Sequence, residues 1–426
     1  MPSTNPSPTL VINDQVNALW KQGKDVLHLA FGESRFPVHP LIKNALTNAV
    51  SNRSYLPSSG TEKLKKIVAD YYSKKLNTSL HPNQILIGVG SKSLLFSMIH
   101  ALDGDILLPK PSWVSYSSIA KLIGKNLTRF KLDRDKDFRL NIDRVDEAYR
   151  SAISKGQNPK SIIINSPNNP IGNTFPKIDI ETVSSWAKKQ NVAILSDEIY
   201  RLITHEGVSY QSSYEFYPEK TIVFSGLSKH LSLGGWRIGI AILPNNGFGA
   251  KLGSHFNAVA GSIWSCVPAP FQIIAETAFS GDDQIESYIQ TCRNIHETRT
   301  HYVYHGLKEL GLNCPKPTGA FYVYASFKNF EKSLNSTGID SCQKLAEYLL
   351  NKYEIATLPG SAFGDEPKNL CLRISTSYLD METDEKAQQI LDIFSNGIDS
   401  TSFMKDYHPR TNLFLSRMNK FLSSLN

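Results

Sequence analysis

The sequence predicts an α/β protein: a three-layer αβα large domain around a mostly parallel sheet, followed by a smaller α+β domain. Between about residues 85 and 243, short apolar runs alternate with segments of helical periodicity, which is typical of a parallel sheet covered by helices. A mostly helical region at 245–300 is followed by a second group of shorter strands and helices. The 426 residues, 41% of them hydrophobic, are enough for two large domains with buried cores.

The elements can be placed along the chain by periodicity and by Gly and Pro breaks. In the first half we expect helices at 11–22, 40–50, 62–76, from residue 91 onward and at 180–190, and apolar strands at 85–89, 105–109, 127–132, 161–165, 192–200, 221–224 and 238–243. In the smaller domain we expect strands at 321–325, 355–358 and 370–376, and helices at 342–353 and 383–394. The predicted division is an N-terminal arm with part of the small domain (1–45), the large domain (46–290), the small domain (291–400) and a tail (401–426) with helical periodicity.

Composition narrows the class of protein. Forty-six Lys and Arg against 39 Asp and Glu give a mild basic excess that is spread along the chain, which favours anionic small ligands over nucleic acid. No apolar run approaches the length of a membrane span, and the N-terminus lacks the pattern of a signal peptide, so we expect a cytoplasmic protein without membrane contact. The five cysteines are scattered, which indicates free thiols and no metal site.

A Ser- and Gly-rich stretch after the apolar run at 221–224 contains the main candidate catalytic residue. It reads Ser225-Gly-Leu-Ser-Lys229 and continues to Gly-Trp-Arg237-Ile-Gly. A lysine whose pKa is lowered by burial or by neighbouring cations can form a Schiff base, and the hydroxyls and the arginine can bind a phosphate. A solvated basic loop is the ordinary interpretation of such a short motif, so a catalytic role for it needs support from other motifs in the chain.

Other polar motifs follow the predicted strands. Gly90-Ser91-Lys92 opens a helix, where unpaired N–H groups favour an anion. Ser-Pro-Asn-Asn169-Pro follows one strand, and Asp197-Glu-Ile-Tyr200 closes another. Ligands of open parallel sheets collect at the carboxyl ends of the strands, so we expect these motifs to share one site.

Taken in order, these motifs and Leu-Arg373-Ile-Ser resemble those of the pyridoxal-phosphate (PLP) enzymes of the aspartate aminotransferase superfamily, class I/II. The resemblance covers roughly residues 25–395. It implies the PLP fold type I, PLP as cofactor, an amino acid and a 2-oxo acid as substrates, and a homodimer with shared active sites.

The resemblance also implies a role for each motif residue. Lys229 would hold PLP as an aldimine and move the α-proton, and Asp197 would pair with the protonated ring nitrogen. Tyr200 and Asn169 would bind the ring hydroxyl, and Trp113 would stack on the ring. For Tyr200 and Trp113, ordinary core packing is the alternative interpretation; for Asp197 it is a helix cap or a salt bridge.

The two anionic ends would be bound separately. Arg373, helped by Asn169 and the backbone at Gly32, would bind the substrate α-carboxylate. The phosphate would contact a further set of residues: the backbone of Ser91 and Lys92, the hydroxyl of Ser225 or Ser228, the side chain of Arg237, and Tyr55 from the neighbouring subunit.

Three departures from the family pattern leave alternatives open. Gly226 stands where the family usually has a serine, so it stays open whether Ser225 or Ser228 donates its hydroxyl to the phosphate. Gly32-Glu-Ser-Arg35-Phe replaces the usual Gly-Glu-Pro-Asp-Phe, and Arg35 is either a reader of a distal carboxylate or a surface charge. Transamination is the leading hypothesis; a PLP-dependent lyase, cyclase or oxidase of the same fold is the alternative, and an aminotransferase-like regulator a remote one. The amino acid itself stays open.

Overall fold

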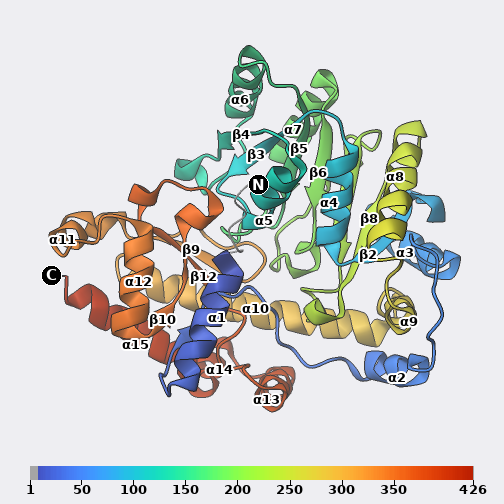
Figure 1. The fold of residues 1–426 in the computed structure, drawn as a ribbon. Helices are drawn as coiled ribbons and strands as arrows, with labels where there is room; N and C mark the ends of the chain where they lie inside the picture. Colours follow the sequence, from blue (N-terminus) through green and yellow to red (C-terminus); the bar gives the residue numbers. More distant parts are fainter. Residues whose placement is uncertain (1–7, 426) are drawn as a thin grey trace.

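The computed structural model describes residues 8–425, and Figure 1 shows them as two parts joined by a long helix, α10 (Asp283–Glu309). The Pro- and Ser-rich segment at 1–7, part of the arm expected at the N-terminus, lies outside the described residues. The larger part contains, in chain order, α2 (Pro40–Ala49), α3 (Glu62–Lys75), β2 (Ile85–Val89), α4 (Ser91–Ala101), β3 (Asp105–Lys110), α5 (Val114–Ile123), β4 (Leu127–Lys131), α6 (Ile142–Ser154), β5 (Pro159–Asn165), α7 (Lys177–Gln190), β6 (Ala193–Asp197), β7 (Thr221–Gly226), β8 (Ile238–Ile242), α8 (Gly247–Ile263) and α9 (Ala269–Ala278).

The seven strands of this part form one sheet in the order β2-β8-β7-β6-β5-β3-β4. All neighbouring strands are parallel except at β8, which is antiparallel to both β2 and β7. The carboxyl ends of the parallel strands therefore meet at one edge. Because β8 runs the opposite way, the residues just before it lie at that same edge.

Helices cover both faces of the sheet (Figure 1). Along β5, Ile163 packs in the cluster that includes α4, α5 and α8, whereas Ile162 and Ile164 pack in the cluster with α7. Side chains of successive strand residues point to opposite faces, so an unbroken apolar run is buried on both sides. The three-layer αβα large domain and the mostly parallel sheet are thus confirmed.

The smaller part combines short strands with helices. Its elements are α1 (Pro8–Lys21), β1 (Leu27–His28), β9 (Tyr322–Ser326), α11 (Glu331–Ser336), α12 (Cys342–Tyr353), β10 (Ile355–Ala356), β11 (Leu358–Pro359), β12 (Cys371–Ser375), α13 (Asp384–Ser395), α14 (Ser400–Tyr407) and α15 (Pro409–Ser423). The order β11-β12-β9 gives an antiparallel sheet, and β1 pairs with β10 in a separate parallel pair. The smaller part therefore has the α+β class that the sequence predicts.

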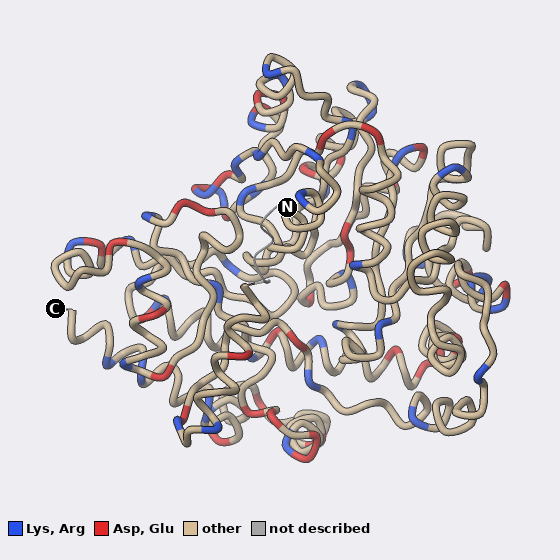
Figure 2. Tube along the Cα trace, viewed as in Figure 1, with Lys and Arg blue, Asp and Glu red and all other residues tan. Residues whose placement is uncertain are grey.

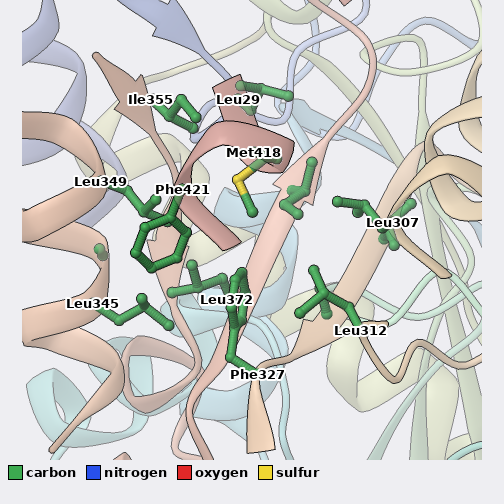
Figure 3. Packing of buried hydrophobic residues seen from close by; sticks show 14 of the residues in the cluster. Leu29, Leu307, Leu312, Phe327, Leu345, Leu349, Ile355, Leu372, Met418 and Phe421 are labelled. Carbon is green, nitrogen blue, oxygen red and sulfur yellow. The ribbon is translucent and has the colours of Figure 1, made fainter. Parts of the chain in front are cut away.

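The core of the smaller part is shown in Figure 3. Leu372 from β12 and Leu345 and Leu349 from α12 are fully buried there. Phe421 and Met418 from α15 pack into the same cluster, so the residues expected to form a tail after 400 complete this core. Asp25 near the N-terminus forms ion pairs with Arg410 (2.5 Å) and Arg417 (2.9 Å), which fix α15 against the segment before β1.

Two strand predictions departed from the observed strands by more than one or two residues at an end or in their pairing. The strand predicted at 192–200 ends at Asp197, because the backbone N–H of Ile199 turns to donate to the Asp197 carboxylate (3.3 Å). The strand predicted at 355–358 is divided between β10 and β11, which pair with different partners. The boundary predicted at residue 290 lies inside α10, and the division into domains stays a prediction.

Charged residues of both signs are interspersed over the two parts (Figure 2). Among the residues described, no helix combines the length and the apolar character needed to cross a membrane. The five cysteines are free, and all but Cys266 are buried.

Candidate active site

One cavity of about 360 Å³ lies at the carboxyl edge of the large sheet, where the smaller part covers it. This volume is in the range of small-molecule sites, about 300–1,000 Å³. The cavity brings together most of the residues expected from the sequence: Gly32, Ser91, Lys92, Trp113, Asn169, Asp197, Tyr200, Ser228, Lys229, Arg237 and Arg373. Motifs nearly 350 residues apart in the chain thus form one site, as the strand-end argument expected.

Lys229 lies in the loop after β7. Its Nζ donates to the carbonyl of Gly32 (2.6 Å) and lies 5.6 Å from the centre of the Tyr200 ring. Burial, reinforced by the positive charge of Arg373, lowers the pKa of the Lys229 amine to about 8. A substantial fraction of the amine is therefore uncharged near neutral pH, as a nucleophile or a general base requires.

Asp197 ends β6 and is fully buried. Its Oδ2 accepts a hydrogen bond from the hydroxyl of Tyr116 on α5 (2.7 Å), and its Oδ1 accepts one from the backbone of Ile199 (3.3 Å). Burial raises the pKa of this carboxyl to about 6, although both hydrogen bonds oppose the shift. No cation forms an ion pair with Asp197 among residues 8–425, so the site holds an acid that suits a cationic ligand group.

Arg373 on β12 is also fully buried. Its Nη1 donates to Oδ1 of Asn169 (3.1 Å) and its Nη2 to the carbonyl of Ala30, while its Nε has no partner among residues 8–425. The guanidinium lies 4.7 Å from the centre of the Tyr322 ring. Burial lowers the pKa of Arg373, yet an arginine remains charged. A buried guanidinium without a carboxylate partner is suited to an anionic ligand.

Tyr200 follows β6 by three residues, and its hydroxyl shares a hydrogen bond with that of Tyr322 on β9 (2.6 Å). Burial raises the pKa of Tyr200 well above its usual value, so the phenol stays neutral. Asn169 is held by its backbone N–H, which donates to Oδ1 of Asn165 (2.8 Å). Both side chains line the cavity, where a phenol and an amide can hydrogen-bond a polar ligand.

An anion site lies at the start of α4. The N-cap Gly90 has a φ of 78°, which favours glycine, and a Cβ there would come within 2.1 Å of the guanidinium of Arg237 and displace it. Arg237 itself has a φ of 57°, an uncommon value for a residue with a side chain, and such strain is often found at functional sites. The first-turn N–H groups of α4, Arg237 and Ser228 thus border the same end of the cavity.

Two expected phosphate contacts do not line the cavity. The Ser225 hydroxyl is buried and accepts a hydrogen bond from Tyr72 (2.8 Å), so this serine is engaged within the core. Of the two serines left open by the sequence, Ser228 is the one at the cavity. Tyr55 is 88% exposed in the loop between α2 and α3, and it does not line the cavity of its own chain.

Several cavity residues were not expected from the sequence. Tyr116 hydrogen-bonds Asp197, and Tyr322 hydrogen-bonds Tyr200. Thr9 and Leu10 of α1 also line the cavity. Tyr116 stands three residues after Trp113, a spacing that puts both aromatics on one side of the helix start and could have signalled it. Arg35 does not line the cavity; it donates to the carbonyl of Glu382 (3.1 Å) and pairs with Glu33 (3.8 Å).

These groups fit PLP. The cofactor needs an anion site for its phosphate, an acid for its ring nitrogen and an amine for its aldehyde, and the cavity offers each of the three at a different element. Arg373, whose Nε has no partner among residues 8–425, is a further cationic group that can bind a substrate carboxylate.

The chain matches the family model described as aminotransferase class I and II over residues 24–391. It is 30% identical to an aspartate aminotransferase of Geobacillus stearothermophilus over 392 residues, which are 89% of this chain and 95% of that one. It is also 30% identical, over 368 residues, to a probable aspartate/prephenate aminotransferase of Aquifex aeolicus, covering 84% of this chain and 89% of the relative.

Solved structures agree with this match. An aspartate aminotransferase from Thermus thermophilus with maleate superposes with a TM-score of 0.79 at 26% identity, covering 93% of this chain and 97% of that one. An aspartate aminotransferase from Thermotoga maritima gives a TM-score of 0.76 at 26% identity, with 92% and 98% covered. The sequence, the sheet and the cavity all lead to one assignment: this chain belongs to the class I and II aminotransferase family and is a PLP-dependent enzyme that transfers amino groups between amino acids and 2-oxo acids.

Proposed function

We propose that the enzyme transfers the amino group of an acidic amino acid, with aspartate as the first candidate, to a 2-oxo acid. The observation that supports this proposal most directly is the convergence of Lys229, Asp197 and Arg373 on one cavity. The choice of an acidic amino acid is supported by the relatives, which are named aspartate or aspartate/prephenate aminotransferases.

Each residue of the site has a proposed task. PLP, when bound, supplies an electron sink for the pair of electrons left on the α-carbon after its proton is removed. Lys229 holds the cofactor and moves the α-proton, because its amine is partly uncharged near neutral pH. Asp197 keeps a proton on the ring nitrogen, and Tyr116 orients the Asp197 carboxylate through its hydrogen bond. Trp113 lines the cavity and stacks on the ring.

Substrate and cofactor are positioned by their anionic groups. Arg373 binds the α-carboxylate, and Asn169 holds the guanidinium in place. The start of α4 with Ser91 and Lys92, together with Ser228 and Arg237, binds the phosphate. Tyr200 bonds the ring hydroxyl, and its own bond to Tyr322 fixes the direction of the phenol.

The assembly that we propose is a homodimer in which Tyr55 reaches the phosphate of the partner subunit. Tyr55 (88% exposed) and Ile263 (66%) are large exposed side chains on neighbouring segments, because Oγ of Ser58 lies 3.8 Å from the position that a Cβ on Gly261 of α8 would take. Exposed apolar groups that gather in one area mark interaction surfaces. The compartment we propose is the cytoplasm, where the free cysteines stay reduced.

A single-turnover experiment tests the reaction and the substrate together. The holoenzyme is mixed with one amino acid at a time, without a 2-oxo acid, and its spectrum is followed. Aspartate or glutamate is expected to convert the cofactor to its amine form, with release of the matching 2-oxo acid. Ammonia release or a cyclic product with the cofactor unchanged would instead support a lyase or cyclase, and equal conversion by aspartate and alanine would contradict the preference for acidic amino acids.

A further inference from the structure

A second cluster of ligating side chains lies outside the active site, where α10 passes the segment that follows β6. His205 comes just after the short helix Arg201–Ile203, and Glu297 and His301 lie on α10. One ligand atom from each of the three lies within 4.8 Å of the other two. Glu297 and His301 are four residues apart on one helix, so their side chains are on the same face.

Hydrogen bonds to carbonyl groups fix both imidazole rings. Nε2 of His205 bonds the carbonyl of Ala320 (3.2 Å), and Nε2 of His301 bonds the carbonyl of Pro317 (3.0 Å). A carbonyl oxygen only accepts, so both Nε2 atoms carry a proton, which leaves Nδ1 of each ring as the nitrogen that can bind a metal. Metal-binding histidines are commonly oriented in this way.

Among residues 8–425, the Nδ1 lone pair of His205 accepts no hydrogen bond. His205 is only 2% exposed, and its Nδ1 is buried without a hydrogen-bond partner. Burial lowers the pKa of His205 to about 3, which keeps the ring neutral. An unpaired buried nitrogen costs free energy, and a bound cation would remove that cost.

The carboxylate completes the set. Oε2 of Glu297 accepts from the backbone N–H of Glu206 (2.7 Å), which holds the group beside His205. None of the three side chains forms a hydrogen bond to another, so they face one another without being joined. Ligand atoms around a tetrahedral ion lie about 3.3 Å apart at bond lengths of about 2.0–2.1 Å, and a rotation of the Glu297 side chain, which is only partly buried, can close the set around an ion.

We propose that His205, Glu297 and His301 bind a divalent transition-metal ion of the zinc type, which ties α10 to the segments at 204–206 and 317–320. Two imidazoles and one carboxylate suit Zn²⁺ and its neighbours in the first transition row, and water takes the remaining position. Arg293 lies close enough to disfavour a positive charge on His205, but its guanidinium donates to Asn294 Oδ1 (3.0 and 2.8 Å) and so is directed elsewhere.

Metal titration of the holoenzyme tests the proposal. His100 and His255 bond each other on the surface (2.9 Å) and form a possible competing site, so every variant carries His255→Ala. After treatment with a chelator, the protein is titrated with Zn²⁺ by calorimetry and with Co²⁺ by visible absorption. We expect one ion per chain, and a loss of affinity of at least about 100-fold in His301→Ala and in Glu297→Gln, because even outer-shell changes cost roughly 10–100-fold.

His305→Ala is the matched control, because this exposed histidine lies one turn beyond His301 on α10 and belongs to no ligand set. It should bind Zn²⁺ like the parent. Circular dichroism establishes whether each variant is folded. If His301→Ala does not fold, the isosteric Glu297→Gln provides the test. Absence of stoichiometric binding in the parent, or retention of the ion in a folded His301→Ala or Glu297→Gln chain, would overturn the proposal.

Discussion

Asp197 illustrates how a residue with a proposed catalytic role can lower stability. Its ordinary pKa is 3.8 and burial raises this to about 6, so the folded chain binds the proton more tightly than the unfolded chain does. As the pH rises from about 4 to about 6, the apoenzyme therefore loses stability. Above that range the full cost remains, about 3 kcal/mol for a shift of roughly two pKa units.

Asp197→Asn should therefore make the apoenzyme more stable while removing activity. We expect the free energy of unfolding at pH 8 to rise by about 1–3 kcal/mol, with the gain shrinking toward pH 4, where the wild-type carboxyl is protonated in both states. Transamination should fall by orders of magnitude, because the ring nitrogen loses its partner. Urea unfolding of the two apoenzymes at pH 8 and pH 4 measures the first effect.

Asp365 offers a control of opposite sign. It too is buried, but the charge of Arg134 and hydrogen bonds from Tyr324 and Asn369 outweigh burial and hold the pKa of its carboxyl below the usual value. Asp365→Asn should lower the stability at pH 8. If Asp197→Asn also lowers it, the proposed cost of the Asp197 charge is wrong.

At the same scale, the sequence identified most of the cavity residues through short motifs at strand ends. Lys229, Asp197 and Arg373 could be predicted because a charged side chain within or beside an apolar run requires a partner. Tyr322 could not, since a tyrosine near an apolar run is equally consistent with core packing, and for Tyr116 the available signal was its spacing from Trp113. Ser225 and Ser228 could not be told apart, because Tyr72, which occupies the Ser225 hydroxyl, is more than 150 residues away in the chain.

At the scale of elements, α15 is the clearest departure from expectation. Its periodicity was visible in the sequence, but a helical pattern does not say which surface it covers. In the structure, Phe421 lies among Phe327, Tyr348 and Tyr353, with ring centres between 5.3 and 6.4 Å apart. The helix therefore forms one wall of the small-part core.

Phe421→Ala should consequently destabilise the protein strongly. The side chain is fully buried, and removal of such a ring typically costs about 3–5 kcal/mol. Lys420→Ala, at the exposed neighbouring position, should change stability by less than about 0.5 kcal/mol. Thermal unfolding monitored by circular dichroism compares the two; a loss below about 1 kcal/mol for Phe421→Ala would mean that α15 is not part of the core in solution.

Strand positions were predicted well and their ends less well. Central strands such as β5 and β7 are apolar on both faces, so their position follows from composition alone. The ends depend on contacts between distant segments: Asp197 ends β6 by bonding the next turn, and β10 leaves the line of β11 to pair with β1. Such pairing is not encoded in any local pattern.

At the scale of the whole molecule, the proposed dimer would place Tyr55 at the partner's cavity, whereas in its own chain it does not line the cavity. Tyr55→Phe should weaken cofactor retention by about 10–100-fold, the effect expected for one hydrogen bond to a charged group. Equilibrium dialysis against PLP, followed by absorbance, measures this change.

A hybrid dimer locates the origin of that tyrosine. One chain carries Tyr55→Phe and keeps Lys229, and the other carries Lys229→Ala and keeps Tyr55. If Tyr55 acts across the interface, the single site containing Lys229 retains PLP with wild-type affinity. Weakened retention at that site would show that Tyr55 acts within its own chain, and a monomer in sedimentation would rule out a shared site.

The core completed by Phe421 and Met418 also contains Leu27 and Leu29, so it joins the two ends of the polypeptide. The large sheet, by contrast, has all its strands once residue 242 has been made. Because proteins are synthesised from the N-terminus and domains tend to fold as units, the sheet can assemble on the ribosome while the core around Leu27 and Leu29 still lacks β9, α12, β10 and α15. The smaller part is thus the last region to complete its core, and a nascent chain released before residue 409 would expose the apolar surface that α15 covers to chaperones and proteases.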